Sequence, residues 1–260
     1  MSELILFIIS ALPVFLLGMY IYKKDKNKEP AKLLVKLFVG GILSCFLVLL
    51  VSGILGAIFP IFSADSSTLN LFELIIYVFI GVALVEECCK WIFSYKIAYN
   101  DNHFDEIFDM IVYSVFVALG FAFFENLLYV YENGVATGIV RAISAVPGHA
   151  CDGVFMGYYL GLAKQSQLNQ RNDLKTKYII YSILVPTILH GIYDYCLFTG
   201  NILFILLFFV FVILVYIFTF KKIKKMSSIN KKMKYVDNYC PNCGMKVESN
   251  FCPKCGRRHD

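Results

Sequence analysis

Acidic and basic side chains interrupt stretches of this sequence that are otherwise apolar. Glu86, Glu87 and Lys90 lie in one such stretch, and Glu125 lies in the next. Placing an ionisable group at membrane depth costs a few kcal/mol or more, so such residues usually serve a function. At about 100° per residue, Lys90 falls between the two glutamates and one helical turn below them. One ammonium could then keep one carboxylate ionised and leave the other free for proton transfer.

Two histidines occur in later apolar stretches. His149 belongs to a series of mostly small residues that recur every fourth position: Ala145, His149, Gly153, Gly157 and Gly161. Small residues at that spacing let helices pack closely in lipid, so His149 is expected to face the protein interior. His190 and Asp194 share a helix face, where the carboxylate could fix the tautomer of the imidazole. At 1.5 Å per residue, Glu86, His149 and His190 lie within roughly 5 Å of the centres of their spans.

These residue types could together hydrolyse a peptide bond. A buried glutamate could act as general base on water and later as general acid. A histidine or Asn126, which follows Glu125, could donate a hydrogen bond to the developing oxyanion. Two histidines with carboxylates could also bind zinc, although the absence of an HExxH motif favours hydrolysis without a metal ion.

Two other classes of function use the same residue types. Chains of Glu, His and Asp form proton relays in membrane transporters. A transporter is expected to contain a second half with matching broken helices, and the sequence has no such repeat. The third alternative is a non-catalytic membrane adaptor that recruits partners.

The elements that must position these residues are transmembrane helices. Of the 260 residues, 58% are hydrophobic and 17% charged, against about 25% charged in soluble domains. Several apolar runs exceed the ~20 residues needed to cross a bilayer. The fold class is therefore an all-α polytopic membrane protein with about seven transmembrane helices. The expected spans are residues 3–22, 33–59, 70–98, 107–131, 135–163, 178–198 and 201–220.

Lysine and arginine alternate between the connections. They are frequent in 23–36, 164–177 and 221–234 and absent from 60–69, 132–138 and 199–201. The positive-inside rule then places the N-terminus outside and the C-terminal tail in the cytoplasm. The net charge of +5 follows from this topology and from attraction to anionic lipid, and it does not indicate nucleic-acid binding.

The last part of the chain predicts a zinc ribbon. A membrane domain over 1–220 is followed by a basic linker, 221–238, and a cysteine-rich module, 239–260. Its four cysteines form two CPxCG turns that suit one tetrahedral structural zinc ion: Cys240, Cys243, Cys252 and Cys255. The reducing cytoplasm keeps such thiols available. The partner of this module cannot be read from the sequence.

The polar residues also resemble those of a known family. Glu86-Glu87-x-x-Lys90, Phe121-x-x-x-Glu125-Asn126, His149 within its small-residue helix, and His190-Gly191-x-x-Asp194 are similar to the four motifs of PrsW-type glutamic intramembrane proteases. That family is related to the CAAX-protease and abortive-infection proteins, and the resemblance covers about 70–200.

The resemblance implies a bacterial plasma-membrane enzyme that cleaves a membrane-anchored anti-sigma factor. By the same resemblance, Glu86 or Glu87 would activate water, and His149 and His190 would bind the oxyanion or a metal ion. Asp194 and Asn126 would orient these groups.

Overall fold

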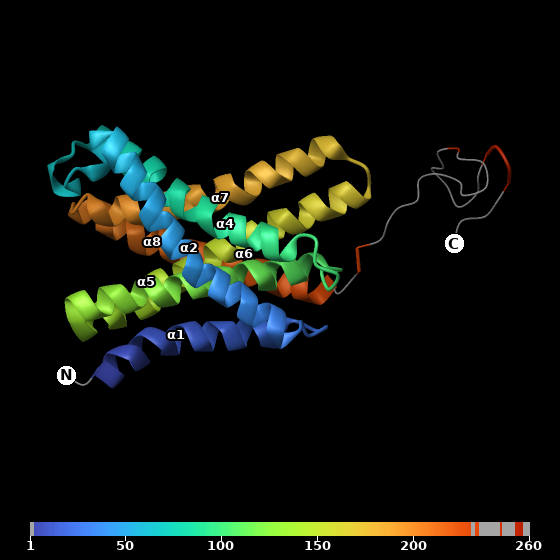
Figure 1. The fold of residues 1–260 in the computed structure, drawn as a ribbon, viewed down its shortest axis with the longest axis horizontal. Coiled ribbons are helices and arrows are strands. Elements are labelled where there is room, and N and C mark those ends of the chain that lie inside the picture. The colour runs from blue at the N-terminus through green and yellow to red at the C-terminus, as the bar shows by residue number, and fades with distance from the viewer. Residues whose placement is uncertain (1–2, 230–231, 234–244, 246–252, 257–260) are drawn as a thin grey trace.

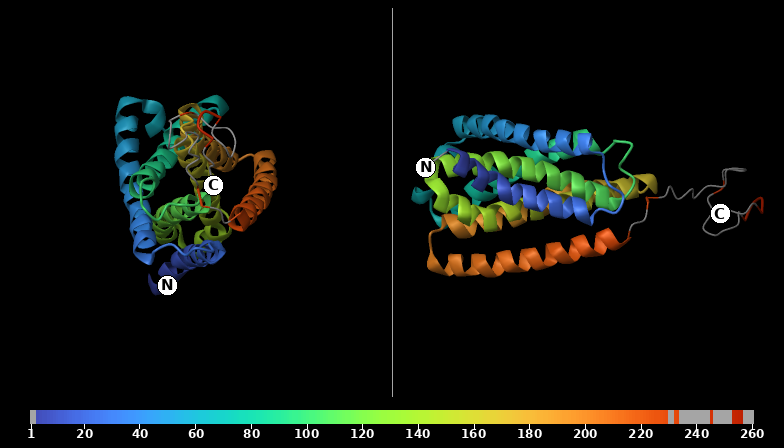
Figure 2. Two further views of the ribbon diagram at one scale, coloured as in Figure 1. Left: turned by 90° about the vertical axis from the view of Figure 1, so that its right-hand side faces the viewer. Right: turned by 90° about the horizontal axis from the view of Figure 1, so that it is seen from below.

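The computed structural model describes residues 3–229, 232–233, 245 and 253–256, and within them all regular structure is helical (Figure 1). The long helices are α1 (Glu3–Lys24), α2 (Ala31–Ile58), α5 (Ile107–Ile143), α6 (Ala145–Leu168), α7 (Asn172–Phe198) and α8 (Ile202–Ile229). Between α2 and α5 lie two 3-10 turns, η1 (Pro60–Ser63) and η2 (Ser66–Thr68), then α3 (Leu71–Ile76), the π-helical segment η3 (Tyr77–Leu84) and α4 (Val85–Ala98). The long helices lie lengthwise beside one another (Figures 1 and 2).

The protein crosses the membrane several times. By length and composition, five helical stretches can span a bilayer, and one of them is α5 and α6 taken together, residues 107–168. The expected span 70–98 is present as the continuous series α3, η3 and α4, but π-helical geometry interrupts it immediately before Glu86. π-Segments inside helices occur frequently at functional sites.

The expected start of the fifth span at residue 135 is wrong. Gly134 adopts φ 80° and ψ −173° inside α5, a conformation that only glycine reaches easily. Residues 135–143 therefore form a short helical stretch beyond this break, and the next span, α6, begins at Ala145. The last span is also longer than expected, because α8 continues to Ile229.

The predicted close packing of the small-residue face is present between α5 and α6. A Cβ atom added to Gly157 would lie 2.2 Å from the Met110 carbonyl oxygen, and one added to Gly153 would lie 2.9 Å from that of Ser114. Only glycine permits such an approach of two helix backbones. This contact fixes α6, which carries His149, against α5, which carries Glu125.

A second close contact places α7 against η3. A Cβ atom on Gly191 would lie 2.5 Å from the ring of Phe79. His190 is the neighbouring residue, so this contact sets the distance between its imidazole and the glutamates that follow η3.

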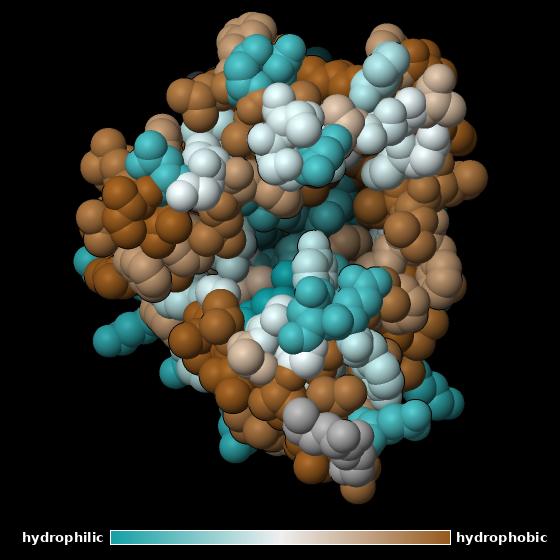
Figure 3. Space-filling view, turned by 90° about the vertical axis from the view of Figure 1, so that its left-hand side faces the viewer, coloured by the Kyte–Doolittle hydropathy of each residue, from teal (hydrophilic) through white to brown (hydrophobic). Residues whose placement is uncertain are grey.

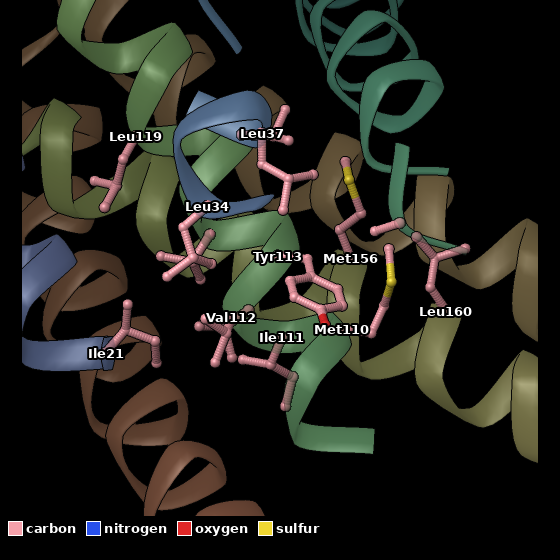
Figure 4. Packing of buried hydrophobic residues seen from close by; sticks show 14 of the residues in the cluster. Ile21, Leu34, Leu37, Met110, Ile111, Val112, Tyr113, Leu119, Met156 and Leu160 are labelled. Atoms are coloured by element: carbon pink, nitrogen blue, oxygen red, sulfur yellow. The ribbon is translucent and has the colours of Figure 1, made fainter. Parts of the chain in front are cut away.

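The bundle contains a large apolar cluster and buries polar groups in two places, around Glu86 and around Glu29. The main apolar cluster joins α1, α2, α5 and α6 through residues such as Leu37, Tyr113 and Met156 (Figure 4). Viewed from the end at which α1 begins, the surface is hollowed and hydrophilic side chains form the floor of the hollow (Figure 3). Helices α1 and α8 are the least enclosed of the five candidate spans. Of their most apolar 18 residues, 17% are buried in α1 and 11% in α8.

Candidate functional site

The two adjacent glutamates of α4 share one cation. Lys90 Nζ lies 2.8 Å from Glu87 Oε1 and 3.3 Å from Glu86 Oε2. The ammonium also lies 4.0 Å from the centre of the Phe121 ring. Lys90 thus contacts both carboxylates and lies nearer to Glu87, and the expectation that it keeps one of them ionised stays a prediction.

His190 faces carboxylates with both ring nitrogens. Its Nδ1 lies 2.8 Å from Glu87 Oε1, and its Nε2 lies 3.3 Å from Asp194 Oδ2 and 3.8 Å from Glu86 Oε2. The predicted pairing of His190 with Asp194 is present. Carboxylates on both sides of a ring hold its orientation and keep at least one nitrogen protonated.

His149 connects the glutamates of α4 to Glu125 of α5. Its Nε2 lies 2.9 Å from Glu125 Oε2, and its Nδ1 lies 3.1 Å from Lys90 Nζ. An ammonium can only donate, so Nδ1 must accept and Nε2 must carry the proton that Glu125 accepts. The partners of His149 thus fix its tautomer and turn the Nδ1 lone pair toward Lys90, which contacts both glutamates.

Four of these residues form a set of potential metal ligands. One donor atom each from Glu86, Glu87, His149 and His190 can be chosen so that all four lie within 4.8 Å of one another. The two imidazole rings are 5.3 Å apart, centre to centre. The donors come from three helices, α4, α6 and α7, which are far apart in sequence.

A cavity of about 90 Å³ reaches this set. The cavity is lined by polar groups that include Glu86, Glu125, Arg141, His149, Asp152, His190 and Asp194, and by apolar side chains of α7 and α8. Glu86 is 8% exposed and borders this space, whereas Glu87 is fully buried and is absent from the lining.

Asn126 does not reach the four-residue set. Its amide donates to the Ser10 carbonyl at 3.4 Å, and its Oδ1 accepts from Arg141 Nε at 3.1 Å. Sequence reasoning left out Arg141, although it was an ionisable residue inside an expected span. Asp152, one helical turn from His149, was visible from its spacing but was given no role, and it lines the cavity. The predicted zinc ligands Cys240, Cys243 and Cys252 lie outside the described residues.

Comparison with known proteins identifies the family. The family model described as "PrsW family intramembrane metalloprotease" matches residues 29–219. The chain is 37% identical to Protease PrsW of Oceanobacillus iheyensis over 213 residues, which are 82% of this chain and 92% of the relative. It is 32% identical to Protease PrsW of Clostridioides difficile over 238 residues, 89% of this chain and 95% of the relative. The chain belongs to the PrsW family of intramembrane proteases. No solved structure shows a significant match.

Membership of the PrsW family decides between the alternatives left by the sequence. It makes the chain an intramembrane protease rather than a transporter or an adaptor. The family description also names a metalloprotease, against the preference for a metal-free mechanism. The absence of an HExxH motif does not argue against a metal ion here, because that motif describes only sites in which both histidines lie on one helix. In this PrsW protein the potential ligands come from separate helices, so no short motif contains them.

Proposed function

We propose that the chain hydrolyses a membrane-anchored protein at the cluster of Glu86, Glu87, His149 and His190. The observation that carries this proposal is the meeting of four donor atoms from three helices within 4.8 Å. Ionisable groups are costly at membrane depth, so four of them at one place support a functional site. The adjoining cavity provides the space for water that hydrolysis requires.

The donor set fits a divalent metal ion such as zinc. Imidazole nitrogens and carboxylate oxygens bind zinc at about 2.0–2.2 Å, so two ligands of one ion lie at most about 4.4 Å apart. The four donors need only a small movement to meet this limit. Glu87 Oε2 is buried and has no hydrogen-bond partner among the described residues, so it retains a free lone pair. The Lys90 ammonium contacts Glu86, Glu87 and His149, so a bound ion would replace it as the partner of these donors.

Glu86 borders the cavity and Glu87 does not, and this difference supports different roles for the two residues. Catalytic zinc sites use three protein ligands and keep one position open. We assign the fully buried Glu87 to this role together with His149 and His190. We assign Glu86, which borders the cavity, to general-base catalysis. Its carboxylate would take a proton from the attacking water and deliver it to the leaving amine.

The remaining polar groups orient this machinery. Asp194 and Glu125 accept from the outer ring nitrogens of His190 and His149, which holds the two rings in place. Lys90 bonds to both glutamates and offsets the repulsion between their charges. A bound metal ion would polarise the scissile carbonyl and make water more acidic.

The proposed substrate is a transmembrane protein of the bacterial plasma membrane. The resemblance to PrsW-type proteases supports an anti-sigma factor, whose cleavage would release a sigma factor during regulated intramembrane proteolysis. The substrate and the enzyme would meet within the bilayer, where apolar side chains of α7 and α8 line the cavity beside its polar floor.

We also propose a topology of seven spans with the N-terminus outside and the C-terminus in the cytoplasm. The spans are α1, α2, the series α3–η3–α4, and α5 to α8. The distribution of lysine and arginine supports this orientation. The cavity would then open toward the outer face, because Figure 3 views the end at which α1 begins.

The C-terminal module over 239–260 is proposed to be a structural zinc ribbon separate from the protease domain, 1–220. The spacing of Cys240, Cys243, Cys252 and Cys255 supports one tetrahedral ion. The basic linker between them begins within α8, and Lys232 Nζ lies 2.5 Å from Asp105 Oδ2 in the connection before α5. The ribbon would therefore lie on the cytoplasmic side.

The proposal is tested by co-expressing the chain with a membrane-anchored anti-sigma factor and following the cleaved fragment on immunoblots. Glu86→Gln is expected to slow cleavage by about 10²–10⁴-fold, since general-base catalysis contributes that much. Glu132→Gln is the matched control, because Glu132 is exposed at the end of the same bundle and should leave the rate unchanged.

Metal content separates the roles of the two glutamates. Purified Glu86→Gln protein should retain the bound metal ion, whereas Glu87→Gln protein should lose it. The measurement uses elemental mass spectrometry on chains that also carry Cys240→Ser, so that zinc in the ribbon does not obscure the result. Cleavage by Glu86→Gln at the wild-type rate would contradict the proposed base. Equal metal in all variants would contradict the proposed ligand set.

A further inference from the structure

Arg141 reaches the site from the short helical stretch that follows Gly134. This stretch, residues 135–143, folds back so that Arg141 contacts residues fifteen and sixteen positions earlier in the chain. Gly138 lies in the same stretch, and a Cβ atom on it would lie 2.6 Å from Ile9 of α1 and 2.9 Å from Val130. The stretch is therefore firmly packed, and it carries Arg141 to a fixed position on the wall of the cavity.

Each part of the Arg141 guanidinium has a defined contact. One terminal nitrogen donates to Glu125 Oε2 at 2.6 Å, and Nε donates to Asn126 Oδ1 at 3.1 Å. The flat face of the group lies 4.0 Å from the centre of the Tyr129 ring. Only a planar fork with several donors can make these three contacts together, and a lysine ammonium cannot.

The oxygen of Glu125 that Arg141 contacts is the same oxygen that accepts from His149. Glu125 Oε2 lies 2.6 Å from the guanidinium nitrogen and 2.9 Å from His149 Nε2. Arg141 therefore holds the carboxylate in the rotamer that accepts a hydrogen bond from Nε2. That proton position leaves Nδ1 as the acceptor that faces the Lys90 ammonium of α4, which itself contacts Glu86 and Glu87.

We propose that Arg141 is a positioning residue of the protease, which acts through Glu125 to set the tautomer and orientation of His149. This inference rests on the proposed assignment of His149 to the active site. Without Arg141, Glu125 can rotate away from His149, and the ring can place its proton on either nitrogen. A ring with the proton on Nδ1 presents no lone pair to the catalytic cluster.

The test compares Arg141→Ala and Arg141→Lys with Arg171→Gln in the full chain. Arg171 is exposed and pairs with Asp173 at 3.5 Å, so its replacement controls for loss of a positive charge. Cleavage of the anti-sigma factor is measured as kcat and KM. Arg141→Ala should lower kcat by about 10–100-fold, the usual effect of removing a partner of a ligand, with little change in KM. Arg141→Lys should restore part of the loss, and Arg171→Gln should behave as wild type.

A spectroscopic measurement gives a readout that does not depend on cleavage. The chain contains four histidines, so selective labelling with ¹⁵N-histidine yields a spectrum that can be assigned by a His149→Ala comparison. The wild-type His149 ring should show the proton on Nε2. The Arg141→Ala ring should show a mixture of tautomers. If Arg141→Ala protein does not fold, Arg141→Gln protein, which has no charge and no planar fork of five donors, supplies the same comparison.

A double-mutant comparison decides whether Arg141 acts through Glu125. In a Glu125→Gln background, Arg141→Ala should add no further loss of kcat. Additive losses, or an unchanged His149 tautomer in the Arg141 variants, would overturn the inference while leaving the proposed active site intact. Full activity of His149→Ala protein would instead overturn the proposed active site.

Discussion

Gly157→Ala should reduce both stability and activity, because Gly157 lies where the backbones of α5 and α6 meet. The added Cβ atom would lie 2.2 Å from the Met110 carbonyl oxygen and 2.6 Å from Ile111 Cα. Ordinary contact begins at 3.4 Å, so the helices must separate by about 1 Å at this point. Overpacking of this kind costs about 1–3 kcal/mol of folding free energy.

The same separation should disturb the candidate active site. His149 is eight residues from Gly157 on the same helix, about 12 Å away at 1.5 Å per residue. A shift of α6 by about 1 Å would lengthen the 2.9 Å contact between His149 Nε2 and Glu125 Oε2 beyond hydrogen-bonding range. Misplacement of a catalytic group by 1 Å can lower the rate by about 10²-fold.

The assay measures unfolding in detergent and cleavage of a membrane-anchored substrate for Gly157→Ala protein beside Gly53→Ala protein. Gly53 lies on α2, and an added Cβ atom there meets nothing within 4 Å, so it controls for the change in residue type. Wild-type stability and activity in the Gly157→Ala protein would refute the reasoning, because the two helices would then tolerate the extra atom.

Three other predictions concern features outside this contact. Burial, together with the nearby charge of Asp25, raises the pKa of Glu29 in the connection between α1 and α2 to about 7. The stability that comes from protonated Glu29 is therefore present at low pH and lost as the pH rises through 7. The melting temperature of Glu29→Gln protein should fall less between pH 5 and pH 8 than that of the wild type. Tyr216 Oη donates to two carbonyls at the α5–α6 junction, both at 3.0 Å, so Tyr216→Phe should lose about 0.5–1.5 kcal/mol in denaturant unfolding, whereas Tyr131→Phe, at an exposed position, should not. Cys240→Ser should remove one zinc ion per chain without changing the cleavage rate, and a lower rate would show that the ribbon is not a separate module.

The features of the fold that repeat along the sequence could be predicted. The small residues before and after Gly153 recur every fourth position, and the structure places that face against α5. The pairing of His190 with Asp194 also follows from helical spacing. These predictions succeed because the period of a helix determines which neighbours share a face.

Features that depend on contacts between distant segments could not be predicted. Gly134 lies in the expected connection between the spans 107–131 and 135–163, but nothing in the sequence shows that residues 135–143 fold back beyond it. That reversal brings Arg141 to Glu125. The different access of Glu86 and Glu87 depends on how α7 and α8 enclose the cavity. Adjacent residues of one helix give no sequence signal for that difference.

The excess of negative charge at the site lowers the stability of the protein without a metal ion, and the same excess would favour binding of such an ion. The carboxyl groups of the site outnumber its lysine and arginine: Glu86, Glu87, Glu125, Asp152 and Asp194 stand against Lys90 and Arg141. A buried carboxylate oxygen without a partner, such as Glu87 Oε2, lowers stability because it has given up water without a replacement. An ion that binds only the folded protein would offset this penalty, by about 2.7 kcal/mol at a concentration one hundred times its Kd. The close contacts of Gly157 with α5 and of Gly191 with η3 would hold the helices that carry His149 and His190 in place when no ion is bound.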